Sequence, residues 1–104
     1  MTRQERATQI WPILTLCATK RQLLTYEDLS WLITVPLPGL GQLLEPIQAF
    51  CISHNLPALT SIVVRRTDGI PGEGFIAAEN VPLAQAGVFS KDWSQQHCPM
   101  PNEL

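Results

Sequence analysis

Few side chains in this sequence have the types and spacing that could carry out chemistry. Cys51 and His54 lie three residues apart in a segment with helical periodicity, so a thiol and an imidazole could meet there as nucleophile and base. Cys51 also continues an apolar stripe, and a histidine near a helix C-terminus interacts favourably with the helix dipole. The structural interpretation is the stronger one, and we expect no enzymatic activity.

Two further patterns are too incomplete to indicate a reaction. The adjacent carboxylates Glu27 and Asp28 would point about 100° apart on a helix, so they do not form an acid–base pair. The glycines at 69, 72 and 74 superficially match a phosphate-binding loop, but they lack the strand-to-helix setting and the Lys-Ser/Thr pair of such loops. We therefore expect no bound nucleotide and no cofactor.

The cysteines do not indicate a metal site or a disulfide framework. Their number is odd, and no CxxC or Cys/His ligand spacing occurs among Cys17, Cys51 and Cys98. We expect no metal, and a reducing compartment suits three free thiols best.

Two arginines and a tryptophan are candidates for binding. Arg65 and Arg66 precede a glycine-rich segment, where two guanidinium groups could contact phosphates or could equally be solvated. Trp31 lies near the polar side of a predicted helix, where an exposed indole would anchor a protein interface. Alternatively, the C-terminal segment around Trp93 covers Trp31.

Composition predicts one soluble domain. The chain has 104 residues, of which 45% are hydrophobic and 15% charged, enough for a single core of modest size. The formal net charge of −2 disfavours a strongly basic nucleic-acid binder. No apolar run approaches the roughly 20 residues of a membrane span, and the N-terminus has no signal-peptide pattern. We expect a cytoplasmic protein.

The first half of the chain is predicted to be helical. Apolar periodicity indicates helices over residues 3–19, 26–33 and roughly 40–54. Thr25 is a suitable N-cap for the second helix, and Asn55 suits the left-handed position after the third. Pro12 either kinks the first helix or lies in its first turn.

A strand and a glycine-rich loop are predicted to follow. The β-branched run Ser61–Arg66 is typical of a strand, and Asp68-Gly69 supplies the positive φ angle of a tight hairpin turn. Residues 75–78 would form a short return strand. Residues 81–87 are predicted to be a short helix or a turn, and residues 88–93 a helix or an extended segment.

These elements predict an α+β fold. Residues 1–104 would form a single winged-helix-like domain of three helices followed by a short antiparallel sheet with a glycine-rich wing. The core would span about residues 8–76, and residues 77–104 would wrap around it.

The order of several short motifs resembles the C-terminal domain of O6-alkylguanine-DNA alkyltransferases and alkyltransferase-like proteins. Thr8–Trp11 resembles that family's Gln-Val-Trp motif, and Leu24–Ser30 resembles its Ser/Thr-Tyr-x-x-Leu-Ala motif. Asn55–Pro57, Ile62–Arg65 and Asp68–Phe75 resemble its Asn-x-Leu, Val-Val and wing regions. The resemblance implies a winged-helix fold and a DNA-contacting surface.

The departures from this family concern its chemistry. Its alkyl-accepting cysteine lies in a Pro-Cys-His-Arg motif before Val-Val, where this chain has residues 59–62, Leu-Thr-Ser-Ile. A threonine hydroxyl ionises far less readily than a thiol, so Thr60 cannot accept an alkyl group. Alkyltransferase-like proteins keep an arginine on the recognition helix, whereas no Lys or Arg occurs here between Gln22 and Val64.

Two hypotheses about function follow. In the first, a non-enzymatic accessory or regulatory module binds a protein partner through Trp31 and through Leu40 and Leu44 of the neutral third helix. In the alternative, implied by the resemblance, the chain binds duplex or damaged DNA through Tyr26, Arg65, Arg66 and the wing amides of Gly72 and Gly74. The acidic residues Glu27, Asp28 and Glu45 would repel phosphate and favour the first hypothesis.

Overall fold

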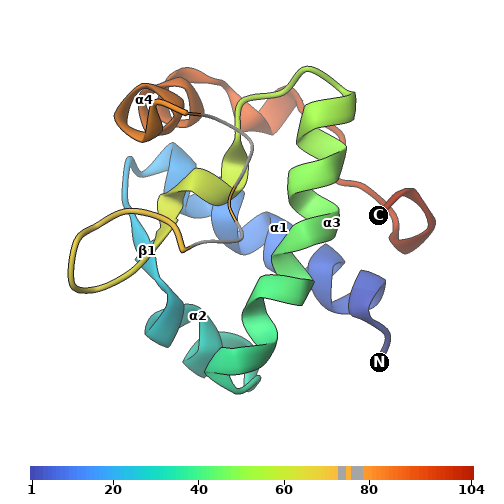
Figure 1. Ribbon diagram of the computed structural model, residues 1–104. Helices are drawn as coiled ribbons and strands as arrows, with labels where there is room; N and C mark the ends of the chain where they lie inside the picture. Colours follow the sequence, from blue (N-terminus) through green and yellow to red (C-terminus); the bar gives the residue numbers. More distant parts are fainter. Residues whose placement is uncertain (73–74, 76–78) are drawn as a thin grey trace.

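Four α-helices and two very short strands make up this computed structural model, which describes residues 1–72, 75 and 79–104 (Figure 1). In chain order the elements are α1 (Arg3–Thr19), β1 (Leu24–Thr25), α2 (Tyr26–Ile33), α3 (Leu40–Ser53), β2 (Val63–Val64) and α4 (Val81–Ser90). Short 3₁₀ turns lie at Leu37–Gly39, Leu59–Ile62, Trp93–Gln95 and Pro101–Glu103. The predicted mixture of helices and a small sheet is confirmed at this coarse level.

The first three helices lie where the sequence predicts them, because local signals define their ends. Thr2 and Glu5 form a capping box at the start of α1. The Thr25 hydroxyl accepts a hydrogen bond from Asp28 N at 3.1 Å and caps α2. Asn55 has φ 53°, which confirms the left-handed position after α3. Pro12 lies within α1 and not in its first turn.

The sheet differs from the prediction. β1 pairs with β2 in parallel, with Leu24 opposite Val63, so the sheet in the described part of the chain is parallel, and the predicted antiparallel sheet is not confirmed. Only Val63–Val64 of the predicted strand is extended, because Leu59–Ile62 winds into a 3₁₀ turn. The partner of this strand thus comes from the segment before α2.

The predicted tight turn does form. Arg65 N donates to Ile70 O at 2.8 Å, and Gly69 N donates to Arg65 O at 2.9 Å. Gly69 has φ +70°, a conformation that favours glycine. Phe75 is not in a strand, and the rest of the predicted return strand, like Gly74, lies outside the described residues.

A fourth helix, α4, forms where the sequence predicts a short helix or a turn over residues 81–87. Asn80 Oδ1 accepts from Leu83 N at 3.1 Å, and a proline lies in the first turn, so α4 has a well-defined start. α4 contains no charged residue and extends to Ser90, so the described chain has four α-helices instead of the three of the predicted winged-helix-like fold. It packs against α1 and against the 3₁₀ turn Leu59–Ile62.

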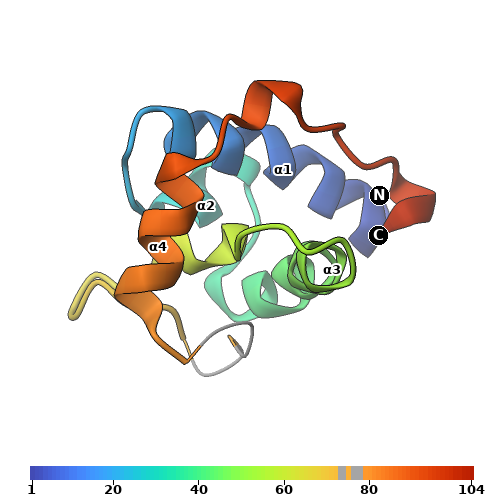
Figure 2. The ribbon, with the colours of Figure 1, turned by 90° about the horizontal axis from the view of Figure 1, so that it is seen from above.

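The core lies between α1, α3 and the 3₁₀ turn Leu59–Ile62, and the C-terminal segment covers one side of α1 (Figure 2). The Trp11 ring packs edge-to-face against Phe50 and Trp93, with centroid distances of 5.6 and 5.9 Å. Trp93 Nε1 donates to Val88 O at 2.8 Å. The C-terminal segment therefore supplies Val88 and Trp93 to the core itself. Among the described residues, no helix is both long and apolar enough to cross a membrane.

Candidate functional site: a pocket between α2, α3 and the Gly72 segment

A partly enclosed pocket of about 220 Å³ lies where the start of α2, one side of α3 and the segment around Gly72 meet. We call it the Tyr26 pocket. Its described lining residues are Tyr26, Gly41, Leu44, Glu45, Gln48, Thr60, Gly72 and Phe75. It thus unites Tyr26 and Gly72 of the predicted DNA surface with Leu44 of the predicted protein interface.

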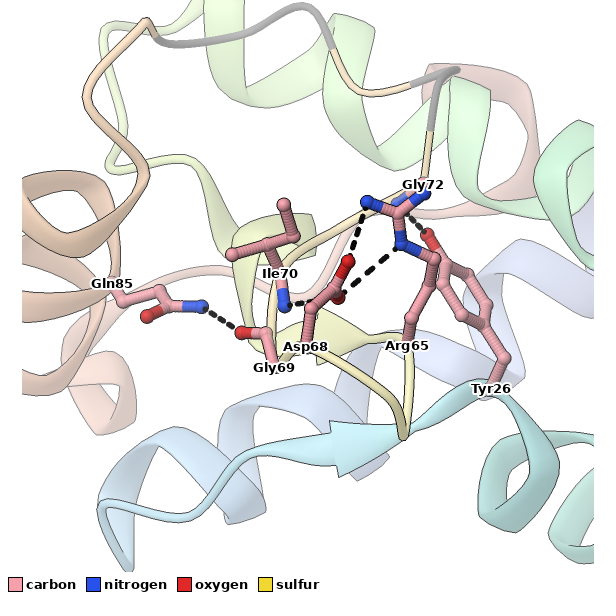
Figure 3. Close-up of polar contacts among 7 residues, drawn as sticks. All are labelled: Tyr26, Arg65, Asp68, Gly69, Ile70, Gly72 and Gln85. Atoms are coloured by element: carbon pink, nitrogen blue, oxygen red, sulfur yellow. Dashed lines mark hydrogen bonds and ion pairs between the residues drawn. The ribbon is translucent and has the colours of Figure 1, made fainter.

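A hydrogen bond across 46 residues joins two walls of this pocket. Gly72 N donates to Tyr26 Oη at 2.8 Å (Figure 3). The Thr25 cap and the adjacent strand β1 fix the position of Tyr26 at the first residue of α2. A Cβ atom at position 72 would lie 3.2 Å from Tyr26 Oη, which is tighter than an ordinary contact. Glycine therefore allows this close approach of backbone to ring.

Thr60 supplies a polar group to a largely apolar wall. Its side chain is 5% exposed, and its Oγ1 atom has no hydrogen-bond partner among the described residues. Ser61 Oγ, next in the chain, is also buried without such a partner, but Ser61 does not line the pocket. A buried hydroxyl without a partner is costly, because it loses its hydrogen bonds to water on folding.

Helix α3 contributes differently from the prediction. Leu40 is fully buried in the core, so its predicted place in a protein interface is wrong. Leu44 is also largely buried, and it lines the pocket. Glu45 is the only charged side chain among the described lining residues, and its Oε2 lies 3.7 Å from Arg3 Nη1.

The two predicted phosphate-binding arginines do not line the pocket, and both are paired. Arg65 Nη2 lies 2.8 Å from Asp68 Oδ2 (Figure 3). Arg66 Nε lies 3.6 Å from Glu27 Oε2. A phosphate would have to compete with carboxylates for both guanidinium groups.

The segment that carries Arg65 is held from two sides. Asp68 Oδ1 accepts from Ile70 N at 3.1 Å, which stabilises the tight turn from within. Gln85 of α4 donates from Nε2 to Ser61 O at 3.0 Å. It also donates to Gly69 O at 3.4 Å (Figure 3). The turn is thereby fixed to α4 and to the 3₁₀ turn that carries Thr60.

Trp31 forms a separate apolar surface on α2. Its side chain is 81% exposed, so the interpretation in which the C-terminal segment covers it is wrong. Trp93 is buried against Trp11 instead. The next residue, Leu32, is half exposed and lines a shallow groove with Pro12 and Ile13 of α1.

The candidate nucleophile and base have other contacts. Burial raises the pKa of the Cys51 thiol, which disfavours the thiolate. The His54 ring stacks on Phe50, with centroids 3.9 Å apart, and His54 Nδ1 lies 2.9 Å from Ser53 Oγ.

Within residues 1–72, 75 and 79–104, no group of three or more potential ligands could hold a metal ion.

Sequence reasoning missed the contributions of Thr60, Gln48 and Phe75 to this pocket. One signal was present, because Thr60-Ser61 interrupts an otherwise apolar run from Leu59 to Val64. Polar residues inside a buried run need partners or a function.

Comparison with known proteins finds no match to this chain among family models, curated proteins or solved structures.

Proposed function

We propose that this chain is a non-enzymatic binding module on a winged-helix-like scaffold, acting as an accessory or regulatory protein. It engages a protein partner that places one uncharged group in the Tyr26 pocket. The pocket carries this proposal, because it combines a mostly apolar wall with a buried hydroxyl that has no hydrogen-bond partner among the described residues. Pockets of this composition are typical binding sites.

The charges around the pocket favour a protein over a nucleic acid. Glu45 is the only charged residue on the described pocket wall, and Arg65 and Arg66 are paired with carboxylates. Duplex DNA carries one phosphate charge per ~1.7 Å of helix axis, so a DNA-binding surface needs available cations.

The exposed indole of Trp31 supports the same proposal. Tryptophan is enriched among the residues that dominate protein interfaces, and this one is 81% exposed beside the half-exposed Leu32. The three cysteines are free thiols, which suits the cytoplasmic location that forms part of the proposal.

A photo-crosslinker at position 41 tests the proposal. Gly41 is exposed at the pocket, and a Cβ atom built there meets nothing within 4 Å, so a benzoylphenylalanine can replace it without a clash. We expect this variant, expressed in its native cells, to crosslink to one protein. The purified partner should bind the wild-type chain and lose at least tenfold in affinity for Gly41→Trp, which fills the pocket mouth.

Leu83 provides the matched control, because it is an exposed helical position on α4 and does not line the pocket. A crosslinker at position 83 should not capture the same partner, and Leu83→Trp should bind it normally. Equal capture from both positions, or full binding by Gly41→Trp, would refute the proposal.

DNA binding remains the second candidate, and one observation favours it. Tyr26, Gly72 and Thr60 all line one pocket, and the family resemblance places a tyrosine, the wing and the alkyl-accepting position at these residues. Titration of fluorescent duplex DNA, with and without O6-methylguanine, over a salt series tests it. Tight binding that weakens steeply with salt and is lost in Arg65→Ala/Arg66→Ala would put this function first. No binding at low salt would eliminate it.

A further inference from the structure

We propose that Thr60 determines the specificity of the Tyr26 pocket. The uncharged group that binds there must bring a hydrogen-bond acceptor to the pocket wall. The inference rests on the proposed function only in taking this pocket to be a binding site. It adds the chemical class of the group that binds there, a neutral carbonyl or amide on a ring-sized apolar body.

The argument begins with the burial of Thr60. Its hydroxyl is removed from water and has no partner among the described residues, yet the residue lines an open pocket. An occupant with an acceptor atom would give this hydroxyl its missing hydrogen bond. An apolar occupant of the same shape would leave this buried hydroxyl without a partner, so the pocket discriminates between the two.

Tyr26 adds a second donor to the wall. Its oxygen accepts the Gly72 N–H, which leaves the phenolic hydrogen available for donation. Two hydroxyl donors on one wall therefore favour an occupant with an acceptor oxygen.

The remaining lining residues define the charge and size of the occupant. The carboxylate of Glu45 is the only charge on the described wall, so a negatively charged occupant would be repelled. The aromatic residues Tyr26 and Phe75 and the aliphatic Leu44 offer contacts to an apolar body. A volume of about 220 Å³ equals that of roughly seven waters at ~30 Å³ each, which is room for a single ring and its substituent.

Three probes that differ in one substituent test this inference on the full chain. Benzamide carries the neutral acceptor, toluene lacks it, and benzoate carries a negative charge. Their affinities can be measured from ¹⁵N–¹H NMR titrations that follow the amide signals of Gly41 and Gly72. We expect benzamide to bind about tenfold more tightly than toluene, the value of one net hydrogen bond, and benzoate to bind most weakly.

Two substitutions then separate Thr60 from its neighbour. Thr60→Val keeps the shape and removes the hydroxyl, so the preference for benzamide over toluene should disappear. Ser61→Ala removes the other buried hydroxyl, which does not line the pocket, and should leave the preference intact. Equal binding of benzamide and toluene to the wild type, no binding of any probe at the pocket, or an unchanged preference in Thr60→Val would overturn the inference.

The outcome is distinguishable from that of the proposed function. Probe selectivity without a crosslinked protein would support the role of Thr60 and refute the protein partner. A partner that is blocked by Gly41→Trp but binds Thr60→Val as tightly as the wild type would support the function and overturn the role of Thr60.

Discussion

Thr60 and Ser61 bury adjacent hydroxyl groups, and neither oxygen has a hydrogen-bond partner among the described residues. This arrangement lowers stability, because each hydroxyl gives up its hydrogen bonds to water. For Thr60, a hydrogen bond to a group bound in the Tyr26 pocket would offset this loss of stability. Ser61 has no such role in the structure, and we find no physical reason for its hydroxyl.

We predict that Thr60→Val and Ser61→Ala each stabilise the free chain, by about 1 kcal/mol, the lower end of the cost of an unsatisfied buried group. The free energy of unfolding from urea titrations measures this effect. The two changes together should exceed either alone. Destabilisation by both substitutions would show that the hydroxyls have partners in solution.

Arg65 and Arg66 show why a list of side chains does not define a binding surface. In the sequence they are two adjacent cations before a glycine-rich segment. In the structure each lies against a carboxylate, and for Arg66 that carboxylate belongs to Glu27, 39 positions earlier. Only the fold determines that pairing.

At the scale of elements, the helices were predictable because their signals are local. Thr25 and Asn55 act within one turn of the backbone, and the apolar periodicity marks the buried side of each helix. The sheet was not predictable, because a strand of two residues has no periodicity. Its parallel partner, Leu24–Thr25, lies on the far side of two helices in the sequence.

The C-terminal 3₁₀ turn, Pro101–Glu103, depends on one carboxylate. Glu103 Oε1 accepts from Met100 N at 2.7 Å and lies 3.0 Å from His97 Nε2. The hydrogen bond from Met100 N, followed by that from His97, lowers the pKa of Glu103 below its ordinary value. The ionised form is therefore favoured in the folded chain. This stabilisation is complete above the ordinary glutamate range and is lost as the pH falls through the lowered pKa.

We predict that acid releases this turn from α1 before the core unfolds. NMR signals of Met100 and Leu104 should shift towards unfolded values below the ordinary glutamate range, while those of Trp11 stay unchanged. Glu103→Gln should show the released signals already at neutral pH. Glu79→Gln, which removes an exposed carboxylate before α4, is the control and should behave as the wild type. Simultaneous loss of the Trp11 and Leu104 signals would contradict the prediction.

At the scale of the whole molecule, the three tryptophans separate into two environments. Trp11 and Trp93 form part of the core, whereas Trp31 projects from α2. An exposed tryptophan adds little to the stability of the free chain, so its place in the sequence calls for another explanation, such as an interface.

We predict that Trp31→Phe removes most of the fluorescence that acrylamide can quench and changes the free energy of unfolding by less than about 0.5 kcal/mol. Trp93→Phe, by contrast, loses the buried hydrogen bond to Val88 O and should destabilise the chain by about 1–3 kcal/mol. If Trp31→Phe leaves quenching unchanged, the indole is covered in solution and the surface around it is not free.

The sequence by itself determined the helices α1, α2 and α3, the caps at Thr25 and Asn55 and the turn at Gly69. Each of the backbone features depends on residues a few positions apart, whose conformational preferences are local.

Only the tertiary structure decided the parallel pairing of the strands, the burial of Leu40 and the exposure of Trp31. It also brought Tyr26, Thr60 and Gly72 around one pocket, although they are separated by 34 and 12 positions in the chain. Such contacts depend on how the helices pack against each other. The periodicity of a helix or strand indicates which side of the element is buried, but not which neighbour it packs against.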